Sequence, residues 1–232
     1  MKCDDFSHTG YAKLMVFDMD STLIDAETIN ELARAAGVSE RVEEITRRAM
    51  DGELDYGKAL RMRVRLLAGL PLKKALEAVD KMPLMPGAVE LVTAVKAMGY
   101  RTAMLSGGFT ISAERIGRLL GMDYVIANEL GVKDGILTGE VAGPLTEHDS
   151  KEKMLLDVAR REKVRPEKCI VIGDGANDIR LFERAGYRIA FNSKPVLRRY
   201  ADVIIGGKDL REVIPVIRSL DKNSRNSQNS AL

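Results

Sequence analysis

The second half of the sequence alternates between short apolar runs and segments with helical periodicity, and this alternation limits the fold more than any other feature. The predicted helices span residues 86–98, 109–120, 152–162 and 179–185. The predicted strands span residues 101–105, 123–127, 169–172 and 188–191, and Asp134-Gly135 indicates a β-hairpin turn. Strands that alternate with helices form mostly parallel sheets covered on both faces, so we expect an α/β fold.

The first half contains one predicted strand, residues 13–17, followed by a long helical stretch. Four helix starts are marked by residues that cap or begin helices: Thr28 with Glu31, Ser39, Asp55 and Pro71. Four helices without a strand between them predict a helical-bundle cap over residues 25–84, inserted after the first strand. Residues 1–24 and 85–220 then form the α/β core. The polar tail, residues 221–232, lacks apolar periodicity and is predicted to be disordered.

Charge and cysteine usage narrow the class of protein. A formal net charge of +2 over 232 residues is too small to indicate nucleic-acid binding. The N-terminal residues hold no apolar signal core, and no apolar run approaches membrane-spanning length. Cys3 and Cys169 form no CxxC pair, which fits a reducing compartment. We therefore expect a cytoplasmic protein that binds neither nucleic acid nor a membrane.

Acidic residues follow two of the predicted strands, and the sequence Ser-Gly-Gly follows another. Four aspartates lie in the loops DMDST and GDGAND: Asp18, Asp20, Asp174 and Asp178. Ligands of such sheets bind beyond the carboxyl ends of the strands, so we expect these loops to meet at one edge. Clustered carboxylates repel one another unless a cation lies among them, and a set of oxygen ligands alone suits Mg²⁺.

Other interpretations of these loops fit less well. Each aspartate could cap the helix that follows it, but a cap does not need two aspartates that flank one apolar residue. The GDG run faintly resembles a dinucleotide fingerprint, but Asp174 and Asp178 would repel a pyrophosphate. The sequence has no GxxxxGK[ST] loop, and its two histidines, His8 and His148, lack the spacing of zinc ligands.

The order of the motifs resembles the haloacid dehalogenase superfamily, and within it the short prokaryotic phosphoserine phosphatases. The resemblance rests on DxDST, SGG, a lone lysine before a helix, GDGAND and the helical insert after the first motif, and it covers roughly residues 13–219. It implies a Rossmann-like, mostly parallel sheet core and a Mg²⁺-dependent hydrolase. The implied reaction converts O-phosphoserine, a small phosphorylated amino acid, to serine and phosphate through an aspartyl-phosphate, the last step of serine biosynthesis.

The resemblance also implies roles for individual residues. Asp18 would be the nucleophile, and Asp20 would be the general acid and then the general base. The second role requires a neutral carboxyl at first, so we expect anionic neighbours to raise the pKa of Asp20. Mg²⁺ would be bound by Asp18, the backbone carbonyl of Asp20 and Asp174, with Asp178 acting through a water or orienting one. The phosphate oxygens would be bound by four further residues: Ser106, Gly107, Lys151 and Asn177.

Arg63 gives support for the substrate that is independent of these motifs. At about 100° per residue, Arg63 falls inside the apolar arc of the helix that follows Asp55. A guanidinium there either extends to the edge of the arc or pairs with an anion, and the residues alone leave both open. The resemblance implies that Arg63 binds the substrate carboxylate and Glu27 its amino group. It also implies that Met50 and Tyr56 line the pocket.

Other functions remain open at this stage. A phosphotransferase on the same scaffold would pass the phosphate to an alcohol instead of water, and a broader phosphomonoesterase would accept other small metabolites. A non-catalytic phosphate- or metal-binding protein would not need both Asp18 and Asp20. The sequence also leaves open whether the chain forms a homodimer.

Overall fold

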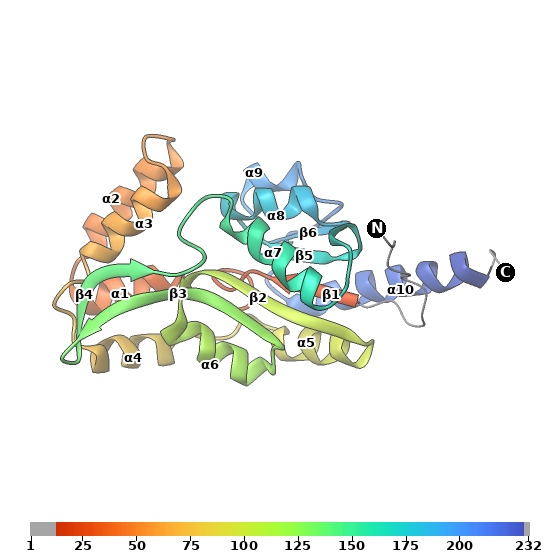
Figure 1. The fold of residues 1–232 in the computed structure, drawn as a ribbon, viewed down its shortest axis with the longest axis horizontal. Coiled ribbons are helices and arrows are strands. Elements are labelled where there is room, and N and C mark those ends of the chain that lie inside the picture. The colour runs from red at the N-terminus through yellow and green to blue at the C-terminus, as the bar shows by residue number, and fades with distance from the viewer. Residues whose placement is uncertain (1–12, 230–232) are drawn as a thin grey trace, which may run out of the picture.

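The computed structural model describes residues 13–229, and these contain one seven-stranded sheet of order β4-β3-β2-β1-β5-β6-β7 (Figure 1). The strands are β1 (Lys13–Phe17), β2 (Tyr100–Phe109), β3 (Tyr124–Lys133), β4 (Ile136–Ala142), β5 (Ile170–Gly173), β6 (Tyr187–Phe191) and β7 (Val203–Ile205). Neighbouring strands are parallel except β4, which is antiparallel to β3. The α/β fold predicted from the sequence is therefore confirmed, and Cys3 and His8 lie outside the described residues.

Helices cover both faces of the sheet. On one face lie α5 (Ala88–Ala97), α6 (Thr110–Leu120) and α10 (Val213–Asn229), and on the other lie α7 (Ser150–Arg161), α8 (Ile179–Arg184) and α9 (Pro195–Arg198). Short 3₁₀ turns span Pro166–Lys168, Ala176–Asp178 and Leu210–Glu212. Alternate residues of β1 point to opposite faces, so Met15 and Phe17 pack in one apolar cluster while Leu14 and Val16 pack in the other.

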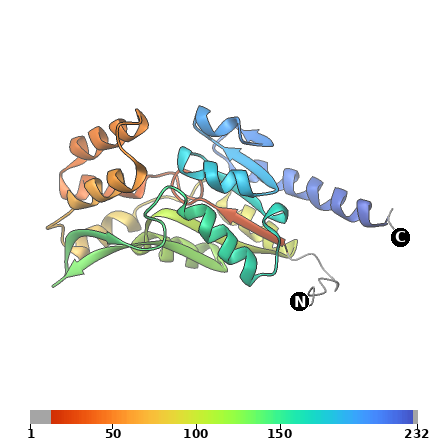
Figure 2. The same cartoon turned by 45° about the horizontal axis from the view of Figure 1, so that its top comes forward.

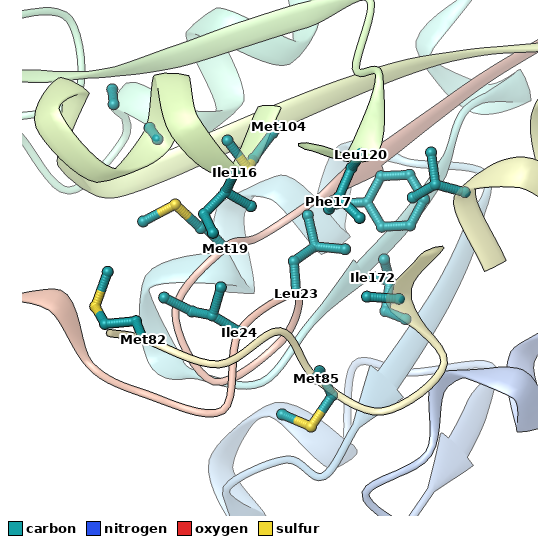
Figure 3. Packing of buried hydrophobic residues seen from close by; sticks show 14 of the residues in the cluster. Phe17, Met19, Leu23, Ile24, Met82, Met85, Met104, Ile116, Leu120 and Ile172 are labelled. Carbon is teal, nitrogen blue, oxygen red and sulfur yellow. The ribbon is translucent and has the colours of Figure 1, made fainter. Parts of the chain in front are cut away.

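The predicted helical insert forms α1 (Thr28–Ala36), α2 (Ser39–Met50), α3 (Tyr56–Arg65) and α4 (Leu72–Asp80). The connection between α3 and α4 is joined to the sheet, because the N–H of Leu137 in β4 donates a hydrogen bond of 2.9 Å to the carbonyl of Leu70 in that connection. The larger apolar cluster also crosses from the sheet into the insert. Figure 3 shows part of it: Leu23 lies beside Phe17 and Ile172 of adjacent strands, and Ile24 and Met82 extend the same cluster on the other side of Leu23. The insert is therefore packed against the sheet as part of one core.

The helix starts differ in part from the prediction. Asp55 caps α3 as predicted, because its carboxylate accepts a hydrogen bond from the N–H of Lys58 at 2.8 Å. The predicted capping box of Thr28 and Glu31 is absent, because the Thr28 hydroxyl donates instead to Asp20 at 2.6 Å. Ser39 is the first residue of α2 and does not cap it. A contact with a distant carboxylate has thus replaced the local cap at Thr28.

Residues 221–229, which the sequence predicts to be disordered, continue α10 away from the sheet (Figure 2). Helix α10 is fixed at its start by buried Val213 and Ile217. The buried carboxylate of Asp221 accepts hydrogen bonds from Tyr100 (2.8 Å) and Lys13 (2.7 Å). No glycine or proline follows within the helix, so nothing in the sequence ends it there. Over residues 13–229 no helix is long and apolar enough to cross a membrane.

Candidate active site

The predicted acidic loops meet at the carboxyl edge of the sheet. Asp18 directly follows β1, and its N–H donates to the carbonyl of Ile172 in the neighbouring β5 at 3.0 Å. Asp174 follows β5, and Asp178 lies one turn further along. Carboxylate oxygens of Asp18, Asp174 and Asp178 lie within 4.8 Å of one another, and all three side chains are buried. The sheet topology thus produces the cluster that the sequence predicts.

Lys151 lies inside this cluster. It is the second residue of α7, is 4 % exposed, and its Nζ donates to Asp18 at 2.6 Å and to Asp178 at 2.7 Å. Burial alone would lower the pKa of Lys151, but the charges of Asp178 and Asp18 outweigh burial and raise it. The lysine therefore carries a permanent positive charge between two carboxylates.

One lysine does not neutralise three buried carboxylates. Burial, together with the charge of Asp178, raises the pKa of Asp18 to about 7. Burial and the charges of Asp18 and Asp178 raise the pKa of Asp174 to about 8. Ionised carboxylates held this close need a further cation, and the donor set of oxygens alone suits a hard divalent ion. The cluster therefore fits a metal site.

Asp20 lies on the same loop but outside the three-carboxylate cluster. Its Oδ1 accepts hydrogen bonds from the hydroxyl (2.6 Å) and the N–H (3.2 Å) of Thr28 at the start of α1. Burial raises the pKa of Asp20 to about 8, and the charge of Glu27 adds to the effect. The sequence correctly predicted a raised pKa, although burial contributes more than the anionic neighbours. A carboxyl that is neutral at pH 7 and free of the metal cluster suits a proton donor.

Ser106, Gly107 and Gly108 lie in the irregular part of β2 beside these carboxylates. This segment is here called the phosphate loop, after the role that the sequence resemblance implies. Ser106 is fully buried, and its Oγ accepts a hydrogen bond from the N–H of Gly108 at 3.0 Å. A Cβ on Gly107 would lie 2.3 Å from the Tyr56 hydroxyl, and one on Gly108 would lie 2.9 Å from an oxygen of Asp20. A larger residue at either position would displace the Tyr56 hydroxyl or the Asp20 carboxylate, so the two glycines leave room for these site side chains.

Arg63 and Glu27 reach the site from the insert side. Arg63 is partly buried, which lowers its pKa, while the charges of Tyr56, Glu27 and Asp20 oppose that shift. Its Nε donates to the carbonyl of Ala59 at 3.3 Å and its Nη1 to the hydroxyl of Thr46 at 3.4 Å. No carboxylate of residues 13–229 forms an ion pair with it. A guanidinium near the site without a paired carboxylate favours anion binding over extension to solvent.

The remaining predicted residues are two that line a cavity and one that is exposed. Asn177 and Tyr56 border a small cavity next to Lys151, together with Glu147 and His148. Met50 is 71 % exposed at the end of α2, so its contact with a substrate stays a prediction.

The sequence did not predict the contacts that three polar residues make in the site. Ser21 donates to Glu27, Thr28 donates to Asp20, and Asn128 bonds to the phosphate loop. Ser21 belongs to the DMDST motif and could have been found there. Thr28 was interpreted as a local cap, and Asn128 stands in an ordinary strand sequence without any signal.

Comparison with known proteins agrees with this geometry. Residues 12–186 match the haloacid dehalogenase-like hydrolase family. A phosphoserine phosphatase from Methanocaldococcus jannaschii is 45 % identical over 206 residues, which cover 89 % of this chain and 98 % of the relative. One from Wolinella succinogenes is 44 % identical over 87 % of this chain and 98 % of its own. The chain spans 60 % of a longer relative from Archaeoglobus fulgidus, which is 44 % identical over 206 residues.

Solved structures of similar proteins share the fold closely. A structure described as a phospho-aspartyl intermediate analogue of phosphoserine phosphatase superimposes with a TM-score of 0.86 at 44 % identity, covering 89 % of this chain and 99 % of that one. A substrate-bound phosphoserine phosphatase complex gives the same TM-score and identity over 90 % of this chain and 99 % of its own. The sequence match, the fold and the acidic loops agree, and the chain belongs to the haloacid dehalogenase-like hydrolase family.

Proposed function

We propose that the chain hydrolyses O-phosphoserine to serine and phosphate through an aspartyl-phosphate on Asp18, with Mg²⁺ as its cofactor. The observation that carries this proposal is the buried site in which Asp18, charged Lys151 and a carboxyl of raised pKa on Asp20 meet at one sheet edge. Relatives with 45 % and 44 % identity over most of the chain are phosphoserine phosphatases, and a similar solved structure is a phospho-aspartyl intermediate analogue.

The residues divide the reaction into two steps. The Asp18 carboxylate attacks phosphorus while Asp20 donates its proton to the departing serine oxygen, so that serine leaves as a neutral alcohol. The ionised Asp20 then takes a proton from the water that attacks the aspartyl-phosphate, which releases phosphate and restores Asp18. Lys151, Ser106 and the N–H of Gly107 would hold the phosphoryl oxygens while charge spreads over them, and Asn177 would help to orient the group.

The acidic cluster would hold the metal ion. Asp18 and Asp174 would be ligands, together with the backbone carbonyl of Asp20, and Asp178 would act directly or through a water. The chemistry that a bound Mg²⁺ would supply is positive charge, which would favour the ionised Asp18 carboxylate and the developing negative charge on phosphate. The raised pKa values of Asp18 and Asp174 support this assignment, because burial and the neighbouring carboxylates both disfavour further negative charge in the absence of a cation.

The insert would select the amino acid. Arg63 would pair with the substrate carboxylate and Glu27 with its amino group, while Tyr56 and Met50 would line the pocket. Two observations on Arg63 support this assignment: it is partly buried, and among the described residues it has no paired carboxylate. The reaction would complete serine biosynthesis in the cytoplasm.

A panel of small phosphomonoesters tests the proposal. The purified chain is assayed for phosphate release from phosphoserine, phosphoethanolamine, phosphoglycolate and p-nitrophenyl phosphate, with Mg²⁺ or with EDTA. We expect phosphoserine to have the highest kcat/KM and EDTA to abolish turnover. Equal kcat/KM for all four esters would contradict the assignment of phosphoserine as the substrate. Transfer of phosphate to added alcohols in preference to water would favour a phosphotransferase.

A further inference from the structure

Asn128 of β3 is fully buried, and its side chain bonds to the backbone of two other segments. Its amide nitrogen donates to the carbonyls of Gly107 (3.1 Å) and Leu145 (3.0 Å), and its Oδ1 accepts from the N–H of Leu145 (2.9 Å). A side-chain amide has two N–H donors, so both are in use. Asn128 therefore connects β3 to the phosphate loop and to the segment that precedes α7.

The phosphate loop needs such a partner because the strand ladder is interrupted there. Leu105 pairs with Ile126, and the next pair in the ladder is Phe109 with Asn128. Residues 106–108 of β2 thus lie opposite the single residue 127 of β3. A bulge of this kind leaves backbone groups without their ladder partners, and a buried carbonyl left unpaired destabilises the fold. The Asn128 amide supplies the missing partner at Gly107.

The second bonded segment leads to Lys151. The carbonyl of Leu145 also accepts a hydrogen bond from the Tyr56 hydroxyl at 3.4 Å. The segment is packed closely against β3, since a Cβ on Gly143 would lie 2.8 Å from the Cα of Asn128. One buried amide thereby fixes the glycine of the phosphate loop and the start of the chain segment that ends in the site lysine.

We propose that Asn128 is a positioning residue for the phosphate site, acting through Gly107 and Leu145 without touching the substrate. This inference rests on the proposed function, because it takes the Gly107 N–H and Lys151 as phosphate ligands. A displacement of such ligands by about 1 Å lowers a rate on the order of 100-fold. We therefore expect loss of the amide to lower kcat/KM roughly 10- to 100-fold, even in correctly folded protein.

The test uses two substitutions that differ in what they remove. Asn128→Ala removes all three hydrogen bonds, whereas Asn128→Asp keeps the shape and the acceptor for Leu145 but removes both donors. Melting temperature, kcat, KM and the inhibition constant of inorganic phosphate are measured for each. We expect both to lower kcat and to weaken phosphate inhibition, for phosphoserine and p-nitrophenyl phosphate alike. The defect should be equal for the two esters because it lies in the phosphate site.

Tyr100→Phe is the matched control. It removes one buried hydrogen bond, from Tyr100 to Asp221, at the opposite end of β2. We expect it to lower the melting temperature while kcat and phosphate inhibition stay at wild-type values. The inference is overturned if Asn128→Ala lowers only the melting temperature and keeps the kcat and phosphate inhibition of the wild type. If the alanine variant does not fold, the same result for Asn128→Asp overturns it. Wild-type protein that releases no phosphate from phosphoserine would instead contradict the proposed function. Calorimetric binding of inorganic phosphate by wild type and variants would then still decide the role of Asn128.

Discussion

Ser21 donates a 2.8 Å hydrogen bond to Oε1 of Glu27 from a backbone with φ of 57°, a left-handed conformation that non-glycine residues seldom adopt. Glycine would take this conformation without steric cost, but it has no hydroxyl. The hydrogen bond orients the carboxylate that we assign to the substrate amino group. We therefore infer that a serine occupies this strained position because its hydroxyl orients Glu27 toward the substrate amino group.

Ser21→Gly should separate the fold from recognition. Relief of strain and the greater freedom of glycine in the unfolded chain oppose each other, so stability should change by less than about 1 kcal/mol. Loss of a hydrogen bond to a charged group costs about 1–2 kcal/mol, which is roughly a 5- to 30-fold rise in KM for phosphoserine. Phosphoglycolate, which lacks the amine, should be unaffected. Ser21→Ala, which keeps the Cβ, should show the same substrate pattern, and equal losses for both substrates would refute the orienting role.

Asp18→Asn should abolish turnover and leave the fold intact. The change is nearly isosteric, it removes the nucleophile, and the circular dichroism spectrum should match that of the wild type. Trapping with radioactive phosphoserine followed by acid quench should label wild-type protein and leave the variant unlabelled. Activity above a few per cent, with deamidation back to aspartate excluded by mass spectrometry, would rule out the covalent mechanism.

The metal site predicts opposite effects of one substitution with and without Mg²⁺. Burial and the charges of Asp18 and Asp178 raise the pKa of Asp174 to about 8, so its ionised form destabilises the metal-free protein. In EDTA, Asp174→Asn should melt at or above the temperature of the wild type. Mg²⁺ at 100 times its Kd should stabilise the wild type by about 2.7 kcal/mol and the variant far less. An Asp174→Asn variant that is stabilised by Mg²⁺ as much as the wild type would exclude Asp174 as a ligand.

Ca²⁺ should bind to the site without restoring activity, since Ca²⁺ accepts longer distances and more ligands than Mg²⁺.

Asp123 gives a stability prediction away from the site. Burial alone would raise its pKa, but two hydrogen bonds from Thr102, each 2.8 Å, and the charges of Lys96 and Arg101 outweigh burial and lower it. A lowered pKa in the folded state stabilises the fold above the unfolded value, about 3.9, and this contribution is lost as the pH falls through the folded value.

Asp123→Asn should therefore lower stability at pH 7 by about 1–2 kcal/mol. Asparagine keeps an oxygen that can accept from Thr102, but it lacks the negative charge that strengthens these bonds and attracts Lys96 and Arg101. The difference from wild type, measured by urea unfolding, should shrink as the pH falls below about 4. Glu44→Gln, which removes an exposed partner of Arg47 on α2, is the control and should leave stability unchanged. A difference that stays constant down to pH 2 would show that shape, and not charge, matters at Asp123.

The sequence predicted those parts of the molecule that depend on local pattern and on sheet geometry. Asp18 and Asp174 follow strands that are neighbours in a parallel sheet, so their meeting follows from the alternation of strands and helices. Lys151 came only from the resemblance, because a lysine at a helix start is ordinarily solvated. Asn128 was not predictable, since its role depends on a bulge in β2 and on the distant Leu145. Local rules failed where distant groups compete with them, as at Thr28, whose hydroxyl bonds to Asp20.

Arg63 provides the sharpest test of the substrate. Its guanidinium is partly buried, and two of its bonds, to Ala59 (3.3 Å) and Thr46 (3.4 Å), are long. A bound carboxylate would offer shorter, charge-assisted bonds in a site shielded by the insert. Arg63→Ala should then cost about 2–4 kcal/mol, because that carboxylate would be buried without a partner. This corresponds to a roughly 30- to 1000-fold loss in kcat/KM for phosphoserine.

The comparison with phosphoethanolamine, which has the amine but no carboxylate, decides between recognition and structure. Arg63→Ala should affect this ester far less than phosphoserine, whereas Glu27→Gln should weaken both because both carry the amine. Arg61→Ala is the matched control, because Arg61 lies on the same helix as Arg63 but is exposed and pairs with exposed Glu147 at 2.9 Å. It should leave the ratio of the two substrates unchanged. Equal losses of both substrates in Arg63→Ala would make the arginine structural and remove the main support for an amino-acid substrate, while the aspartyl-phosphate chemistry of Asp18 would stand.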